Sequence, residues 1–315
     1  MKIIPFLLLC CGVSSYCQAQ EDLSRQFDSV GTGHQKVLYT YKGTRIIMGH
    51  STEMLRKHEL DFRVDHRFGD AAGEFGGVKS FFGTDNSTDI RIAFEYGVSD
   101  KLMVGVGRSK GSGAQHQLID GLVKYRLLEQ TTDNYVPVSM AVLANATVST
   151  MASGTDPEGA DYFGDGADRM NYVAQAIISR KVGDKLSFTL SPTYVHRNRV
   201  AFMDMNNMFA LGAAGRIKVS KRVGFVVEYY YPFRSQASKD YFKSAGNVIF
   251  YNPLGVGMEI ETGGHVFHIN FTNSTAIQES QFIPETLSSW RQGQYRWGFN
   301  ISRRFTLFGK KDWKK

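Results

Sequence analysis

The strongest constraint on this chain is a two-residue alternation of large apolar and charged side chains, which recurs from Glu59 almost to the C-terminus. In its first occurrence the two kinds of residue interleave as Leu60, Asp61, Phe62, Arg63, Val64 and Asp65. Only an extended strand turns successive residues to opposite faces, so each occurrence predicts a β-strand with one apolar and one polar face. We count about twelve such strands, most of them long enough to cross a membrane at a tilt.

The connections between these strands alternate in length. Very short turns are predicted at Ser99-Asp100, Gly183-Asp184, Ser220-Lys221 and Gly263-Gly264, with a slightly longer connection near 130–134. The intervening connections are mostly long, at 69–87, 152–168, 198–205, 234–252 and 273–293, whereas 110–114 is short. Short turns at one end and long loops at the other are typical of outer-membrane β-barrels, whose turns face the periplasm. A sandwich would not require this regularity.

The sequence therefore predicts an all-β fold: a single antiparallel up-and-down transmembrane β-barrel of about twelve strands. No run of about 18 apolar residues follows the first segment, which excludes a helical membrane protein. Closing the sheet into a barrel bonds every backbone group to a neighbouring strand and removes the sheet edges. Tyrosine and tryptophan gather near the strand ends, where girdles at the membrane interfaces are expected.

The polar faces predict a charged interior of mixed sign. Sixteen residues are expected to line the lumen: Asp61, Arg63, Asp65, Arg67, Arg91, Glu95, Asp120, Lys124, Arg126, Arg216, Glu228, Glu259, Glu261, His268, Arg296 and Arg304. Unpaired burial of such groups is costly, so they must pair across the lumen or line water. We expect a narrow lumen crossed by salt bridges and partly plugged by a loop or by the leader. The charges either hold the interior together or line a conducting path.

The start of the chain resembles an export signal, with Lys2 followed by a nearly unbroken apolar run to Val13. We predict a cleaved signal peptide at 1–19, a periplasmic leader at 20–57, the barrel at 58–308 and a basic tail at 309–315. A buried N-terminal helix and a lipoprotein signal are the alternatives. All three cysteines, Cys10, Cys11 and Cys17, lie in the signal, so no disulfide or thiol chemistry is expected after cleavage.

Chemistry-bearing patterns are few. His66 is predicted to lie outward at the interface and His268 to be a hydrogen-bonded lumen residue, although each has a rarer alternative as proton relay or ligand. The loop acids Asp156, Asp161, Asp165 and Asp168 are either solvated or hold Ca²⁺, without an EF-hand spacing. No G-x-S-x-G or metal-ligand motif occurs. We therefore expect no catalytic residue, no metal and no cofactor, and the net charge of +7 is too dispersed to predict nucleic-acid binding.

The stretch from His58 to Gln130 carries a set of motifs. They are Leu60-Asp61-Phe62, His66-Arg67-Phe68-Gly69, Phe81-Phe82-Gly83, Tyr96-Gly97-Val98-Ser99-Asp100, the run from Leu102 to Ser109, and Lys124-Tyr125-Arg126-Leu127-Leu128. This stretch resembles a β-barrel family of Bacteroidetes-type bacteria, domain of unknown function family 5777. The resemblance implies an outer-membrane barrel and brings no substrate. The basic tail after Phe308 departs from the terminal aromatic residue of many such barrels.

Three functions remain open at this point. The first is a narrow channel or transporter for small polar solutes. The second is a structural or docking barrel that binds a partner through loops 69–87 and 234–252. The third is an outer-membrane lipid hydrolase. The expected partners are outer-membrane lipid, the barrel-assembly machinery and small polar solutes, after Sec-type export to the cell outer membrane.

Overall fold

The computed structural model describes residues 34–308. The predicted signal peptide, the first part of the leader and the basic tail lie outside the described residues.

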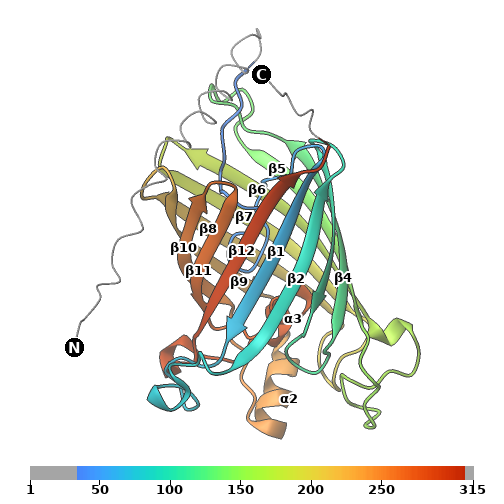
Figure 1. Ribbon diagram of the computed structural model, residues 1–315. Helices are drawn as coiled ribbons and strands as arrows, with labels where there is room; N and C mark the ends of the chain where they lie inside the picture. The colour runs from blue at the N-terminus through green and yellow to red at the C-terminus, as the bar shows by residue number, and fades with distance from the viewer. Residues whose placement is uncertain (1–33, 309–315) are drawn as a thin grey trace, which may run out of the picture.

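Twelve antiparallel strands form one closed sheet (Figure 1), in which each strand pairs with its sequence neighbours and β1 pairs with β12. Their bounds are β1 Glu59–Phe68, β2 Ser87–Gly97, β3 Leu102–Ser109, β4 Leu118–Leu128, β5 Ser139–Ser149, β6 Met170–Val182, β7 Leu186–Arg197, β8 Asn207–Lys218, β9 Val223–Pro232, β10 Leu254–Thr262, β11 His265–Thr272 and β12 Arg296–Thr306. The seam aligns Leu60 with Phe305 and Val64 with Ile301. The predicted twelve-stranded up-and-down barrel is confirmed.

The two faces of the wall follow the alternation in the sequence. Charged residues such as Asp61, Arg91 and Glu95 are fully buried, whereas outward neighbours such as Phe94 and Leu190 are exposed. Because the side-chain period of a strand is two, one register places every charge of a strand on the inner face. The barrel therefore has an apolar outer surface and a polar inner one.

The two ends of the barrel differ, as the connection lengths predicted. At the short-turn end, uppermost in Figure 1, the β2–β3, β6–β7, β8–β9 and β10–β11 connections are tight turns. At the long-loop end, the β9–β10 loop carries α2 (Gln236–Gly246) and the β11–β12 loop carries α3 (Glu279–Glu285). No helix in the described part is both long and apolar enough to span a bilayer.

Most of the described part of the predicted leader lies inside the barrel, as the expected plug, whereas residues 34–36, 38 and 39 are exposed. The chain passes through the short-turn end, and nearly all of 40–55 is buried inside the barrel before it joins β1 (Figure 1). Helix α3 is buried in the lumen as well, from the opposite end. The interior is thus filled by two segments that enter from opposite mouths, and their apolar residues share one core cluster with the wall.

Candidate functional site: the plugged lumen

The N-terminal segment forms a tight hairpin inside the barrel. Its turn is closed by hydrogen bonds from the Ile46 amide to the Gly49 carbonyl (2.9 Å) and from the Ser51 amide to the Thr44 carbonyl (3.0 Å). A Cβ atom at Gly49 would lie 1.9 Å from the hydroxyl of Tyr230, so only glycine fits this seat. We call residues 42–55 the plug hairpin and residues 46–49 its tip.

One wall carboxylate holds the tip of the plug hairpin. Glu228, on β9, accepts hydrogen bonds from the backbone N–H groups of Ile47 (3.0 Å), Met48 (2.6 Å) and Gly49 (3.0 Å). The Ile47 carbonyl in turn accepts from Arg67 (2.9 Å) and Asn300 (2.8 Å). Buried backbone groups that lack a strand partner need such bonds, and here the barrel wall supplies them.

The stem of the plug hairpin is held in the same way. Glu259 accepts from the Lys42 amide (2.7 Å), and Glu95 accepts from the Thr44 hydroxyl (2.8 Å). The Lys124 ammonium donates to the Glu53 carbonyl (2.7 Å), and Lys42 forms an ion pair with Glu261 (2.6 Å). Wall groups of both signs therefore bind plug-hairpin backbone or side chains.

The remaining wall charges pair with one another. Arg91 binds both oxygens of Asp120 (3.0 and 2.6 Å) and lies 3.5 Å from Asp65. Arg63 lies 3.5 to 4.0 Å from the acids that surround it, Asp61, Asp65 and Glu95. A further pair joins Arg216 and Glu259 at 2.5 Å, with His268 3.6 Å from the same carboxylate. Pairing of this kind offsets the large cost of burying each charge alone.

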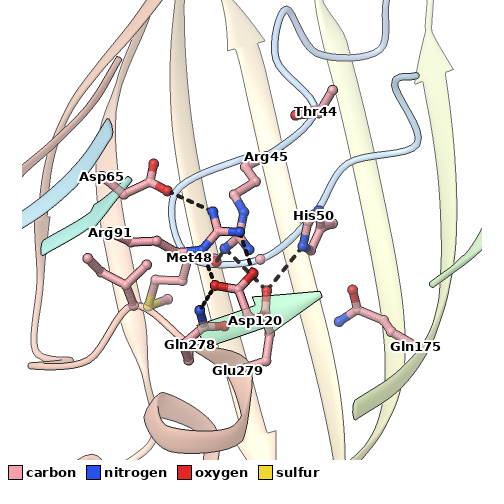
Figure 2. A network of polar contacts seen from close by, with 12 residues as sticks. Thr44, Arg45, Met48, His50, Asp65, Arg91, Asp120, Gln175, Gln278 and Glu279 are labelled. Carbon is pink, nitrogen blue, oxygen red and sulfur yellow. Dashed lines mark hydrogen bonds and ion pairs between the residues drawn. The ribbon is translucent and has the colours of Figure 1, made fainter. Parts of the chain in front are cut away.

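The two plugs meet inside the lumen (Figure 2). Glu279, the first residue of α3, lies 3.3 Å from Arg45 and 3.4 Å from His50, both in the plug hairpin. The neighbouring Gln278 donates to Asp120 at 2.7 Å, which connects α3 to the wall pair Arg91–Asp120. Contacts from both plugs and from the wall therefore converge at one place.

A second charged cluster closes the long-loop mouth. Arg197 binds Asp204 (2.9 Å) and Glu285 at the end of α3 (2.7 Å). Arg234 pairs with the same Asp204 and donates to the Pro284 carbonyl (2.7 Å). We call these four charged residues, 197, 204, 234 and 285, the outer clamp. Burial opposes ionisation of Asp204, but the two arginines outweigh it and lower the pKa of this carboxyl.

One part of the inner wall is apolar. The inward residues Val173, Val195, Met208, Ala210, Val226 and Tyr230, on β6 to β9, form a cluster with Ile46, Ile47 and Met48 of the tip and with Phe282 and Ile283 of α3. Sequence reasoning missed this patch because it assigned the inner face to polar residues alone. The sequence did carry a signal, because in four consecutive strands these apolar residues stand at the alternate positions that are otherwise polar.

The sixteen predicted lumen residues divide by depth. Thirteen are buried: Asp61, Arg63, Asp65, Arg67, Arg91, Glu95, Asp120, Lys124, Arg216, Glu228, Glu259, His268 and Arg296. Arg126, Glu261 and Arg304 lie at the short-turn end and are partly exposed, with side-chain exposures of 17% for Arg126 and 33% for Glu261. Arg126 pairs with Glu129 in the adjoining connection (3.1 Å) and not with a lumen acid.

The other candidate residues lie away from the lumen network. His66 stacks on Phe299 with a centroid distance of 5.2 Å, so it belongs to the outer face. In the loop between β5 and β6, Asp165 and Asp168 accept from nearby backbone amides (2.7 Å each, at Ala167 and Gly164). Within 34–308, no group of three or more His, Cys, Asp or Glu side chains has the arrangement of a metal site.

Solved porin and channel structures and one family model are similar to the chain. Among solved structures, the chain is similar to the NanC porin (TM-score 0.45, 10% identity, covering 79% of this chain and 100% of the other) and to the KdgM porin (0.44, 9%, 78% and 99%). It is also similar to the COG4313 outer membrane channel from Pseudomonas putida F1 (0.44, 12%, 81% and 98%). No curated protein matches the chain significantly. A family model matches residues 41–305 and so takes in the plug hairpin together with all but the end of the barrel. The chain belongs to the family described as membrane bound beta barrel domain (DUF5777).

Proposed function

We propose that this protein is a gated channel for small polar solutes in the outer membrane of a Gram-negative bacterium, and that the structure is its closed state. The plug hairpin is the inner gate, at the short-turn end. Helix α3 with its loop, the outer gate loop, is the outer gate, at the long-loop end. The sixteen charged residues predicted from the sequence are the lining of the path that opens when both gates withdraw.

One observation carries this proposal: wall carboxylates bind the backbone of the plug hairpin. Glu228 uses both its oxygens on backbone amides of the tip, and Glu259 binds the backbone amide of Lys42 in the stem. Glu95 adds a bond to the side-chain hydroxyl of Thr44. A buried ion or ion pair is often no more stabilising than apolar residues of similar volume. A permanently filled lumen would therefore gain little from charged walls, whereas a lumen that fills with water needs them.

The wall also indicates what passes. Acids and bases are interspersed on the inner face, so no single sign of charge dominates a solute's path. The interior of a twelve-stranded barrel is intermediate between small barrels filled by side chains and the wide pores of about 16 strands. Small polar or zwitterionic solutes fit both properties.

The fold and the chain start support this location. The apolar outer face needs lipid, and bacterial barrels of this type occupy the outer membrane. The first residues fit a Sec signal that is removed on export, with the barrel-assembly machinery and outer-membrane lipid as further partners. The long-loop end then faces the outside, and the resemblance to family 5777 favours a Bacteroidetes-type source.

Conductance in planar bilayers tests the proposal. The intact chain should be closed most of the time. A variant that lacks residues 42–55 and has loop 276–286 replaced by a short Gly-Ser linker should conduct steadily, while each single change leaves one gate in place and gives intermittent current. Heat-modifiable migration in gels verifies that each variant is a folded barrel. A folded double variant that stays silent would refute the channel and leave a purely structural barrel.

A further inference from the structure

The β1–β2 loop, residues 69–86, exposes an unusual amount of apolar surface at the long-loop end. Phe75, Val78, Phe81 and Phe82 have exposures of 77%, 82%, 67% and 50%. Isolated exposed apolar residues are common, but several large ones close together in one loop mark an interaction surface. We call these four residues the apolar foot.

The backbone of this loop is fixed in a conformation that keeps the apolar foot out of the core. Phe81 and Phe82 both adopt left-handed φ angles, 46° and 54°, which are unfavourable for bulky side chains. Internal hydrogen bonds hold the conformation, from Phe82 to Gly77 (2.7 Å) and from Gly69 to Gly83 (2.9 Å). A Cβ at Gly83 would lie 2.5 Å from the Gly69 carbonyl oxygen, so the close approach requires glycine. The loop therefore has a defined backbone conformation that presents the apolar foot to the outside.

The loop lies against the rim of the barrel. The amides of Ala71 and Ala72 donate to the carbonyls of Tyr295 (2.8 Å) and Gly293 (3.2 Å), just before β12 begins at Arg296. In Figure 1 the loop lies at the lower left, beside the β11–β12 loop, and extends sideways from the strands. These bonds hold the apolar foot at the rim of the barrel, beside the start of β12.

Aromatic residues occupy the outer face at the same level. Phe271 packs against Trp297 (centroid distance 4.0 Å), and Tyr295 stacks on Trp290 (4.9 Å). Such residues form the girdles of membrane barrels at the lipid–water interface. The same Tyr295 whose ring joins this girdle accepts the hydrogen bond from Ala71, so the loop is attached directly to the girdle.

We propose that the apolar foot is a lipid-contact site, in which the β1–β2 loop inserts Val78 and the phenylalanines into the interfacial region of the outer leaflet. A lipid surface is the occupant that the structure favours, because the foot continues the apolar outer face, which the proposed membrane location places in lipid. Lys79, which lies between Val78 and Ser80, is exposed and can extend its ammonium to the head groups while its stem stays with the apolar chains. The membrane then also steadies residues 293–295, the stem of the outer gate loop.

Single spin labels test this directly, because the only cysteines, Cys10, Cys11 and Cys17, lie in the segment predicted to be cleaved. The probe is introduced as Val78→Cys. Leu190→Cys on the outer face of β7 is the lipid reference and Lys239→Cys on the exposed side of α2 is the water reference. Each labelled barrel is reconstituted in phosphatidylcholine–phosphatidylglycerol vesicles. Collisions of the label with oxygen, which partitions into lipid, are compared with collisions with a water-soluble nickel chelate.

The expected result is a ratio of oxygen to nickel collisions at position 78 that is several-fold above the Lys239 value and approaches the Leu190 value. A ratio equal to that of Lys239 would overturn the proposal. Protection from both reagents with dipolar broadening between labels would also overturn it, since a second copy of the chain would then cover the foot. Phe81→Ser, added to the chain labelled at position 78, should lower the ratio there at least twofold. Thr84→Ser in the same loop and the same labelled chain should leave the ratio unchanged.

Discussion

Replacing Glu228 by glutamine should open the inner gate without disturbing the barrel. The carboxylate binds three tip amides with its two oxygens, and it also lies 3.5 Å from the Tyr230 hydroxyl. Glutamine retains the shape but has one acceptor, and its NH₂ group then faces a backbone N–H. Hydrogen bonds to charged groups contribute about 1.5–3 kcal/mol each, and loss of the buried charge offsets part of their loss. We expect the closed state to lose about 2 kcal/mol, a shift of roughly 30-fold.

The assay is the single-channel open probability in planar bilayers, which should rise roughly 30-fold for Glu228→Gln. Glu261→Gln is the matched control, because Glu261 pairs with Lys42 of the same hairpin (2.6 Å) but is one-third exposed. Exposed ion pairs contribute at most about 1 kcal/mol, so its effect should be fivefold or less, by the same conversion. Equal effects of the two substitutions, or an unchanged open probability in a folded Glu228→Gln barrel, would refute the idea that this carboxylate holds the tip.

Three further predictions concern the two plugs and the outer clamp. Glu279→Gln removes the carboxylate beside Arg45 and should destabilise the closed state by about 3 kcal/mol. Adding Arg45→Met to that variant should restore at least a third of the lost stability. Additive effects of the two substitutions in this double-mutant cycle would contradict the pairing. Gly49→Ala should release the tip, which is measured as faster proteolysis of the plug hairpin in folded barrels. Tyr230→Phe in the same chain should partly restore resistance to proteolysis, because the clashing hydroxyl is gone. Unchanged proteolysis in the double variant would argue against the close contact between Gly49 and Tyr230. The pKa of Asp204 is lowered in the folded state, so its contribution to folding stability is complete above the unfolded pKa of about 3.9 and is lost as the pH falls through the lower folded value. Asp204→Asn should therefore lower the midpoint of the thermal gel shift by the same amount at pH 7 and pH 5, and by less below pH 4. A difference that already shrinks between pH 7 and pH 5 would contradict the lowered pKa.

Much of the wall could be predicted from the sequence because strand periodicity is local. One register fixed by Leu60 and Asp61 decides the orientation of the rest of β1, and the same holds for each strand. The short glycine turns, such as Gly263-Gly264, then fixed the connectivity.

The plugs could not be located in the same way because their positions depend on contacts distant in sequence. The plug hairpin has no period, and its tip is held by Glu228, about 180 residues away in the chain. Three consecutive apolar residues, Ile46 to Met48, were a signal that the leader was not simply polar. Similarly, Phe282 and Ile283 were too apolar for an exposed loop, yet nothing local indicated that α3 turns inward.

The two kinds of contact at the tip have different roles in a gate. When the hairpin of the proposed gate withdraws, water replaces the hydrogen bonds of Glu228 and of the Ile47 carbonyl. In net terms a bond between neutral groups then contributes about 1 kcal/mol, and a bond to the Glu228 charge about 1.5–3 kcal/mol. The side chains of Ile46, Ile47 and Met48 are fully buried against the apolar wall patch, and exposing them costs roughly 1.5–3 kcal/mol each as an upper estimate. Both kinds of contact therefore keep the proposed gate closed. The polar contacts also fix the position of the tip, since a shifted tip would leave Glu228 and three amides unpaired. A stimulus that supplies about 5 kcal/mol of differential binding is enough to invert such an equilibrium. Glu279 joins the hairpin to α3, so binding at the long-loop end can supply part of that free energy. A solute that displaces α3 would weaken the inner gate before reaching it.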